Sequence, residues 1–176
     1  MKRNIQLWQL MGFAVTSLGG TLLHFLYDWT GQSILTAPIS GVNESTWEHM
    51  KLLYFPLLFY AIVQSHFFRE RKVFWCVKLR GTLFGLVLIP VLFYTLNGAF
   101  GKTPNWINIA IFFAAAAATF LTENRWFQKN STFCPHPKPA LAFIGLIGIL
   151  FVLFTFIPPT IPLFRDPVTG MYGIIP

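Results

Sequence analysis

Charged side chains are scarce in this sequence. Asp, Glu, Lys and Arg make up 11% of its 176 residues, whereas hydrophobic residues make up 55%. An average soluble domain carries about 25% charged residues. So few charges cannot cover the surface of a soluble fold, and the apolar residues fall into long runs that favour lipid as the solvent. The composition therefore excludes an ordinary soluble domain and predicts an all-α membrane protein of one domain.

Motifs of the common soluble enzymes are also missing. The sequence has no phosphate-binding glycine loop, no dinucleotide-binding motif and no nucleophile elbow. Its formal net charge of +7 would suit a nucleic-acid partner, but the basic residues lie between the apolar runs. We therefore interpret the basic charge as a signal of membrane orientation and expect no nucleic acid as a partner.

Five apolar runs approach the roughly 20 residues that a helix needs to cross about 30 Å of hydrocarbon. They are Gln6–Tyr27, Thr46–Phe67, Phe74–Leu96, Trp106–Thr122 and Ala140–Ile157. The sequence thus predicts a compact bundle of about five transmembrane helices over residues 1–157. Residues 158–176 are rich in proline and predict an extracytoplasmic segment that packs on the bundle. Residues 33–42 are too short to span and predict a loop or a shallow re-entrant segment.

Basic residues predict the orientation. Of the 13 Lys and Arg residues, ten fall on one side of the predicted spans, and cytoplasmic loops are the basic ones. We therefore predict that the N-terminus lies inside and the C-terminus outside. The first apolar run is too long for a signal peptide and lacks a prompt cleavage site, so we expect it to stay in the protein. Cys76 and Cys134 both fall on the cytoplasmic side, where we expect reduced thiols and no disulfide.

Ionisable residues gather at the outer end of the first two predicted helices. They are His24, Asp28, Glu44, Glu48, His49 and Lys51. Such residues are costly in a membrane and usually face a cavity or a partner. His24 and Asp28 share a helix face because they are four residues apart. Neighbouring residues on a helix point about 100° apart, so His49 points away from Glu48. His49 can therefore cluster with both Glu44 and Glu48 only if its helix begins after Glu44.

The best candidate ligands for a divalent metal such as zinc are therefore His24, Asp28 and Glu48. Glu44 and His49 are second-rank ligand-binding candidates. The same groups would also bind a cationic ligand or share protons. A structural alternative stays open, because Ser45 to Glu48 is a capping-box pattern and Glu48 has the spacing of an ion pair with Lys51.

Two further patterns have structural interpretations. Glu123 and Arg125 end the fourth predicted helix, where we expect them to be solvated. Small residues at four-residue spacing predict close helix packing. These small residues are Gly81 and Gly85 in the third run, and Ala110, Ala114 and Ala118 in the fourth.

Three motifs together carry a resemblance. They are His24-Phe-Leu-Tyr-Asp28, Asn43-Glu-Ser-Thr-Trp-Glu-His49 and the C-terminal Asp166-Pro-Val-Thr-Gly-Met-Tyr-Gly. The chain resembles, over nearly its whole length, a family of small bacterial integral membrane proteins with a domain of unknown function. The resemblance implies a multi-pass protein of the bacterial inner membrane and supplies no catalytic residue.

Three functions stay open at this point. The first is a binding or transport component that captures a metal ion or a small cationic or polar ligand; it would need a homo-oligomer or a membrane partner subunit, since five helices are few for a lone carrier. The second is a membrane-embedded metal-dependent hydrolase with Glu44 or Glu48 as general base. The third is a structural or regulatory membrane subunit.

Overall fold

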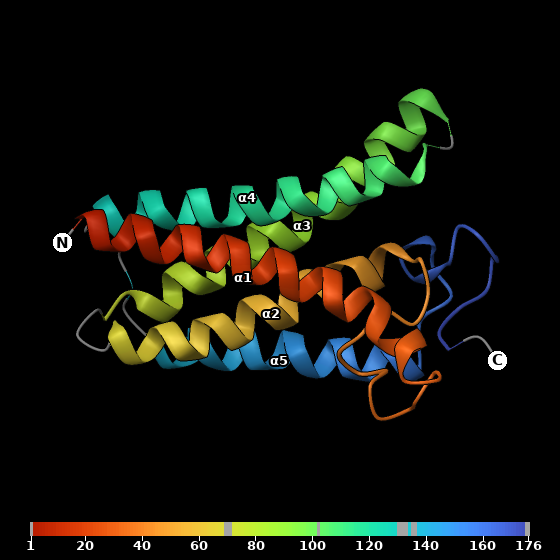
Figure 1. Cartoon of the computed structure of the whole chain (residues 1–176), viewed down its shortest axis with the longest axis horizontal. Helices are drawn as coiled ribbons and strands as arrows, with labels where there is room; N and C mark the ends of the chain where they lie inside the picture. The colour runs from red at the N-terminus through yellow and green to blue at the C-terminus, as the bar shows by residue number, and fades with distance from the viewer. Residues whose placement is uncertain (1, 69–71, 102, 130–133, 135–136, 175–176) are drawn as a thin grey trace.

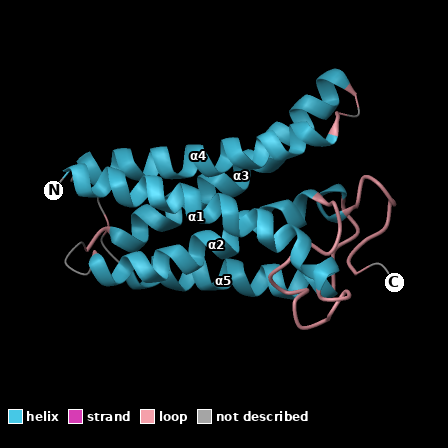
Figure 2. Cartoon of the chain, viewed as in Figure 1, coloured by secondary structure: helices cyan, strands magenta, loops and turns pink. Residues whose placement is uncertain are grey.

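Five helices lie side by side along the long axis of the molecule (Figure 1). The computed structural model describes residues 2–68, 72–101, 103–129, 134 and 137–174. The α-helices are α1 (Lys2–Trp29), α2 (Thr46–Phe67), α3 (Phe74–Phe100), α4 (Asn105–Lys129) and α5 (Pro137–Phe156), and a short 3₁₀ helix, η1, covers Pro162–Phe164. Loops join them (Figure 2). The predicted all-α class with five helices is confirmed.

Four of these helices are long and apolar enough to cross a membrane. These segments are Asn4–Trp29, Phe74–Phe100, Trp106–Lys129 and Pro137–Phe156. The fifth predicted span, α2, is not among these candidates; it carries Glu48, His49 and Lys51 near its start and Gln64 near its end. The structure therefore supports four candidate spans, and a fifth crossing by α2 stays a prediction.

The surface of α1 is arranged as lipid would require. Gln9, Thr16 and Ser17 are buried, whereas Leu10 and Leu18 are exposed. In water this distribution would be unfavourable, because apolar area would be solvated while polar groups are desolvated. In a bilayer it is expected, because polar and small residues pack between helices and large apolar residues face lipid.

Helix α2 is the centre of the bundle. It packs against α1, α3, α4 and α5, and twelve of its 22 residues are buried. Leu52, Leu53 and Tyr54 belong to the main hydrophobic core. The Tyr54 hydroxyl donates a hydrogen bond to the Ile144 carbonyl of α5 at 2.5 Å. Burial is concentrated in the first half of α2, whereas Phe59, Ile62 and Val63 in its second half are exposed.

Close packing of α3 against α4 depends on glycine. A Cβ atom built on Gly85 would lie 2.1 Å from Thr119 Oγ1, and one built on Gly81 would lie 2.5 Å from Glu123 Cγ. The two glycines thus pack as the sequence predicted. On α4, however, the fully buried alanines are Ala115 and Ala116.

The alanines predicted for this contact do not make it. Ala110 and Ala114 are exposed and Ala118 is half-buried. Four-residue spacing shows which residues share a face of a helix, but it does not show which face turns towards the neighbouring helix. In α4 the face that carries Thr119 and Glu123 turns towards the two glycines of α3. Towards their connecting loop, α3 and α4 turn away together from α1 and α2 (Figure 1), and Pro90 lies inside α3.

The expectation of two free cysteines is wrong in this structure. Cys76 lies in the first turn of α3 and Cys134 in the connection from α4 to α5, and a disulfide joins them with their Cα atoms 6.0 Å apart. Their proximity follows from the antiparallel course of α3 and α4, which brings the start of one helix to the end of the other. The expected compartment of two cysteines does not reveal whether they lie close together in the fold.

The chain after α5 folds against the start of α2. Phe164 in η1 is buried, with its ring centroid 4.6 Å from that of Trp47. The Asn43 side-chain amide donates to the Gly173 carbonyl at 2.8 Å. The Asp166 carboxylate accepts hydrogen bonds from the Val168 backbone N–H and the Thr169 hydroxyl, both at 2.8 Å. Residues 158–174 therefore lie beside the polar layer at this end of the bundle.

Candidate metal and ligand site

Three ligand-type side chains meet at the end of α1, at the start of α2 and in the loop between them. Glu44 Oε1 lies 3.7 Å from His24 Nε2, and Glu44 Oε2 lies 3.6 Å from His49 Nε2. The two imidazole rings are 5.8 Å apart between centroids. Each residue offers one ligand atom such that all three lie within 4.8 Å of one another. His24, Glu44 and His49 are hereafter the triad.

The backbone around Glu44 is fixed on both sides. The Asn43 side-chain oxygen accepts the Ser45 backbone N–H at 2.8 Å, an Asx-turn geometry. Ser45 is the N-cap of α2, and its hydroxyl accepts the Glu48 backbone N–H at 3.3 Å. Glu44 therefore precedes the helix, and its carboxylate can turn back towards His49, which a helical Glu44 could not easily do.

Each histidine of the triad is held by a neighbour. His49 Nδ1 lies 2.9 Å from the Ser45 carbonyl oxygen, to which it can donate its proton. Nε2, on the Glu44 side, then carries a lone pair, which is the arrangement typical of metal-ligating histidine. The His24 ring stacks on Phe25 with centroids 5.1 Å apart.

The distances suit a small divalent metal. In tetrahedral zinc sites, bonds of about 2.0–2.2 Å to nitrogen and oxygen place neighbouring ligand atoms about 3.3 Å apart. One Glu44 oxygen lies 3.7 Å from His24 and the other lies 3.6 Å from His49. With one ligand atom from each residue, the three atoms lie within 4.8 Å of one another, so the side chains would move closer by up to about 1.5 Å to bind zinc. Two imidazoles and one carboxylate also match the ligand preference of zinc. Three protein ligands leave the fourth position open for water or another ligand.

Glu48 is engaged elsewhere. Its carboxylate forms an ion pair with the Lys51 ammonium at 2.5 Å, and both side chains are buried. Glu48 also accepts the Val42 backbone N–H at 3.1 Å. Lys51 donates in addition to the Ala37 carbonyl and the Thr155 hydroxyl, each at 2.9 Å. Through these hydrogen bonds, the Glu48–Lys51 pair connects the loop before α2 and the end of α5 to α2.

Asp28 does not belong to the triad either. It lies one turn beyond His24 in α1 and is exposed. The structure therefore brings together His24, Glu44 and His49, whereas the sequence ranked His24, Asp28 and Glu48 first. The position of Glu44 outside the helix decides this difference, and the sequence signal for it was the N-cap serine at position 45.

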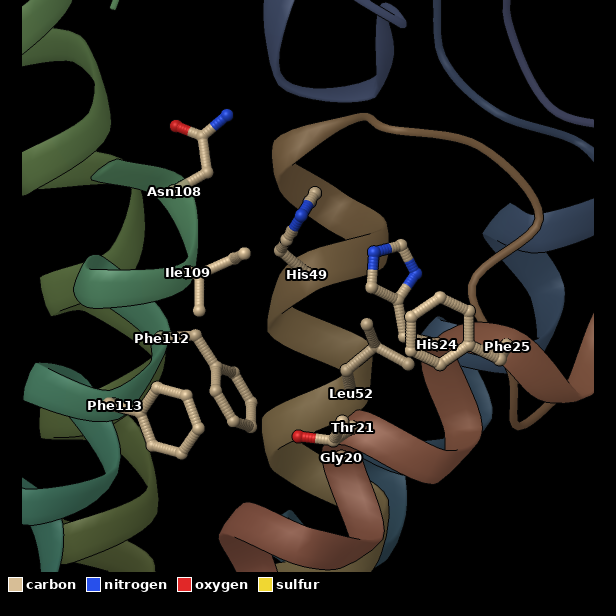
Figure 3. A pocket seen from close by; sticks show the side chains of 10 residues that line it. All are labelled: Gly20, Thr21, His24, Phe25, His49, Leu52, Asn108, Ile109, Phe112 and Phe113. Atoms are coloured by element: carbon tan, nitrogen blue, oxygen red, sulfur yellow. The ribbon is translucent and has the colours of Figure 1, made fainter. Parts of the chain in front are cut away.

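A cavity of about 170 Å³ adjoins the triad between α1, α2 and α4 (Figure 3). His24 and His49 stand at one end of it, together with Asn108 of α4. Most of the remaining lining is apolar, including Leu52 and Phe112. The site thus has a polar end and an apolar body.

Comparison with known proteins gives one match. A family described as a family of unknown function (DUF6512) matches residues 1–174 of the chain. The chain belongs to DUF6512. This confirms the resemblance to a family without an assigned function. The family description assigns no activity that could be attributed to the triad. No curated protein and no solved structure matches the chain.

This DUF6512 protein has a second buried ion pair at the opposite end of the bundle. Lys78 Nζ of α3 lies 2.6 Å from Glu123 Oε2 of α4, and both side chains are fully buried. The aromatic rings of Tyr60, Phe74 and Phe120 surround the ammonium at 5.3–5.8 Å from their centroids. The expectation that Glu123 is solvated is therefore wrong, because the contact of α4 with Gly81 turns Glu123 inwards.

Proposed function

We propose that this protein is a multi-pass membrane protein that binds a divalent metal ion, zinc in the first place, through His24, Glu44 and His49. The observation that carries the proposal is the convergence of three ligand atoms from α1, the loop and α2 within 4.8 Å. The orienting contact from His49 Nδ1 to the Ser45 carbonyl supports it.

The position of the triad suggests a role in binding or transport. With a cytoplasmic N-terminus, the ends of α1 and α2 that hold the triad lie on the outer side of the membrane, which in a bacterial cell is the inner membrane. The triad would then capture a metal ion from outside. The lipid bilayer is the immediate partner, and a transport path would require further copies of the chain or another membrane subunit.

A metal-dependent hydrolase is the second candidate. It is favoured by the cavity that adjoins the triad, because a substrate there would face the open metal position. In that case Glu44 would be a metal ligand. Glu48 would not serve as general base, since Lys51 and Val42 hold its carboxylate.

Metal binding is tested with purified protein in detergent. After treatment with a chelator, zinc is titrated by calorimetry and the metal content is measured by mass spectrometry. We expect one zinc per chain, and we expect His24→Ala, Glu44→Gln and His49→Ala each to weaken binding by at least about 100-fold.

His66→Ala is the matched control. His66 also bonds its Nδ1 to the carbonyl four residues earlier, at 3.0 Å, but it is exposed and lies at the other end of α2. Wild-type protein that binds no zinc, or three triad variants that bind it as well as His66→Ala does, would overturn the proposal. The triad would then serve only to hold the loop before α2 against α1.

A further inference from the structure

The cavity beside the triad indicates the class of ligand that the site takes. We infer that the metal-loaded triad binds an amphiphile whose polar head carries metal-binding oxygen atoms and whose alkyl chain occupies the cavity between α1, α2 and α4. This inference rests on the proposed function, since the head is held by the metal.

The cavity has the size and lining for an alkyl chain. Its volume is about 170 Å³, and an engineered apolar cavity of about 150 Å³ in another protein holds a six-carbon ring. Leu52, Phe112 and Phe113 supply apolar walls. Because Gly20 has no side chain, the ring of Phe112 approaches α1 closely: a Cβ atom at Gly20 would lie 2.4 Å from Phe112 Cζ.

The cavity also continues into the lipid-facing surface. Phe25, Ile109 and Phe113 line it, and all three are also exposed on the outside of the bundle. Trp29 at the end of α1 and Trp106 at the start of α4 are exposed at the same end, as tryptophans at the membrane interface are. An amphiphile from the bilayer could therefore enter sideways, with its head already at the depth of the triad.

Asn108 supplies a second polar contact for the head. Its side-chain oxygen is buried and has no hydrogen-bond partner among the described residues, although Asn108 lines the cavity close to His49 (Figure 3). A buried amide oxygen without a donor is costly. A head group with an O–H or N–H beside its metal-binding oxygens would satisfy this oxygen and the open metal position together.

Hydroxamic acids test this inference, because they combine two metal-binding oxygens with a donor. Octanohydroxamic and acetohydroxamic acid are titrated into zinc-loaded protein and into chelator-treated protein at one fixed detergent concentration. With zinc, we expect the octano compound to bind about 15- to 60-fold more tightly than the aceto compound, the gain from burying two to three methylene groups. Without zinc, we expect this binding to be lost.

Two variants separate the cavity from general partitioning into detergent. Ile109→Trp fills the cavity mouth and should abolish the chain-length preference, with zinc affinity unchanged because Ile109 supplies no metal ligand. Ile62→Trp places the same side chain at another exposed position of the bundle and should keep the preference.

The outcomes distinguish the two proposals. If zinc binds but both hydroxamates bind equally, or if Ile109→Trp keeps the preference, the amphiphile inference is overturned and the metal site stands. The same holds if the octano compound binds chelator-treated protein equally well. If wild-type protein binds no zinc, the metal site and the amphiphile inference are overturned together.

Discussion

His49 bonds through Nδ1 to the carbonyl oxygen of Ser45, the residue that caps its own helix, at a distance of 2.9 Å. The same serine receives the Glu48 backbone N–H on its hydroxyl. One residue therefore ends the loop, starts α2 and orients the imidazole. Glu44, immediately before Ser45, is left free of the helix and turns towards His49 and His24.

The first prediction separates the two sets of metal ligands. Asp28→Asn should leave zinc affinity within about threefold of wild type, because Asp28 is exposed and outside the triad, whereas Glu44→Gln should weaken it at least about 100-fold. Zinc titration by calorimetry at constant pH measures both. If Asp28→Asn lost zinc affinity and Glu44→Gln changed it little, the metal ligands would be His24, Asp28 and Glu48, as the sequence predicted.

The second prediction concerns the buried Glu48–Lys51 pair. Lys51→Met should lower the free energy of unfolding by about 3–5 kcal/mol, because it strands the Glu48 carboxylate in the protein interior. Adding Glu48→Met should recover part of this loss, since no unpaired charge then remains. Thermal unfolding followed by circular dichroism in detergent measures these changes.

Lys129→Met is the control for this pair, because Lys129 is exposed at the end of α4. The folded fraction of Lys51→Met should still bind zinc, since neither member of the pair belongs to the triad. If Lys51→Met is no less stable than Lys129→Met, the pair does not hold the loop to α2 and α5.

The third prediction concerns the contact of α3 with α4. Gly85→Ala should lower the free energy of unfolding by about 1–3 kcal/mol, because the new methyl group would overlap Thr119 Oγ1. Gly145→Ala in α5 is the matched control: no atom lies within 4 Å of its added Cβ, and alanine favours a helix by up to about 1 kcal/mol over glycine. Equal stability of the two variants would mean that α3 and α4 do not approach so closely.

The fourth prediction concerns the Cys76–Cys134 disulfide and the orientation of the chain. The basic residues predict that both cysteines lie in the cytoplasm, where thiols are kept reduced. We therefore expect maleimide to label both cysteines when intact cells are alkylated before lysis. Protein purified without reductant should contain the disulfide, as the structure shows. Mass spectrometry of the two samples distinguishes these states.

A disulfide already present in intact cells would contradict the predicted orientation. That end of the bundle would then face an oxidising compartment, and the triad at the opposite end would face the cytoplasm. Cys76→Ser controls for labelling, since it leaves one cysteine that cannot pair within the chain.

The fold class followed from local properties of the sequence. Helix content and the number of helices depend on apolar runs and the breaks between them, and these can be counted residue by residue. The sequence placed the start of α2 correctly at Thr46, because the capping preference of Ser45 is local as well. It also located the polar layer at one end of the first two helices, since depth along a helix follows from residue number.

Tertiary packing decided what the sequence could not. Periodicity gives the angle between two side chains on one helix but not the rotation of that helix within the bundle, so it could not tell that Glu123 points inwards to Lys78. Nor could it tell that Lys51 reaches Ala37 and Thr155 and so holds Glu48 out of the triad. The partners of Cys76 and Glu44 depend on contacts between segments distant in the chain or outside any helix, where no periodic rule applies. Residue order thus determined which groups lie at the same depth, and three-dimensional packing determined which of them touch.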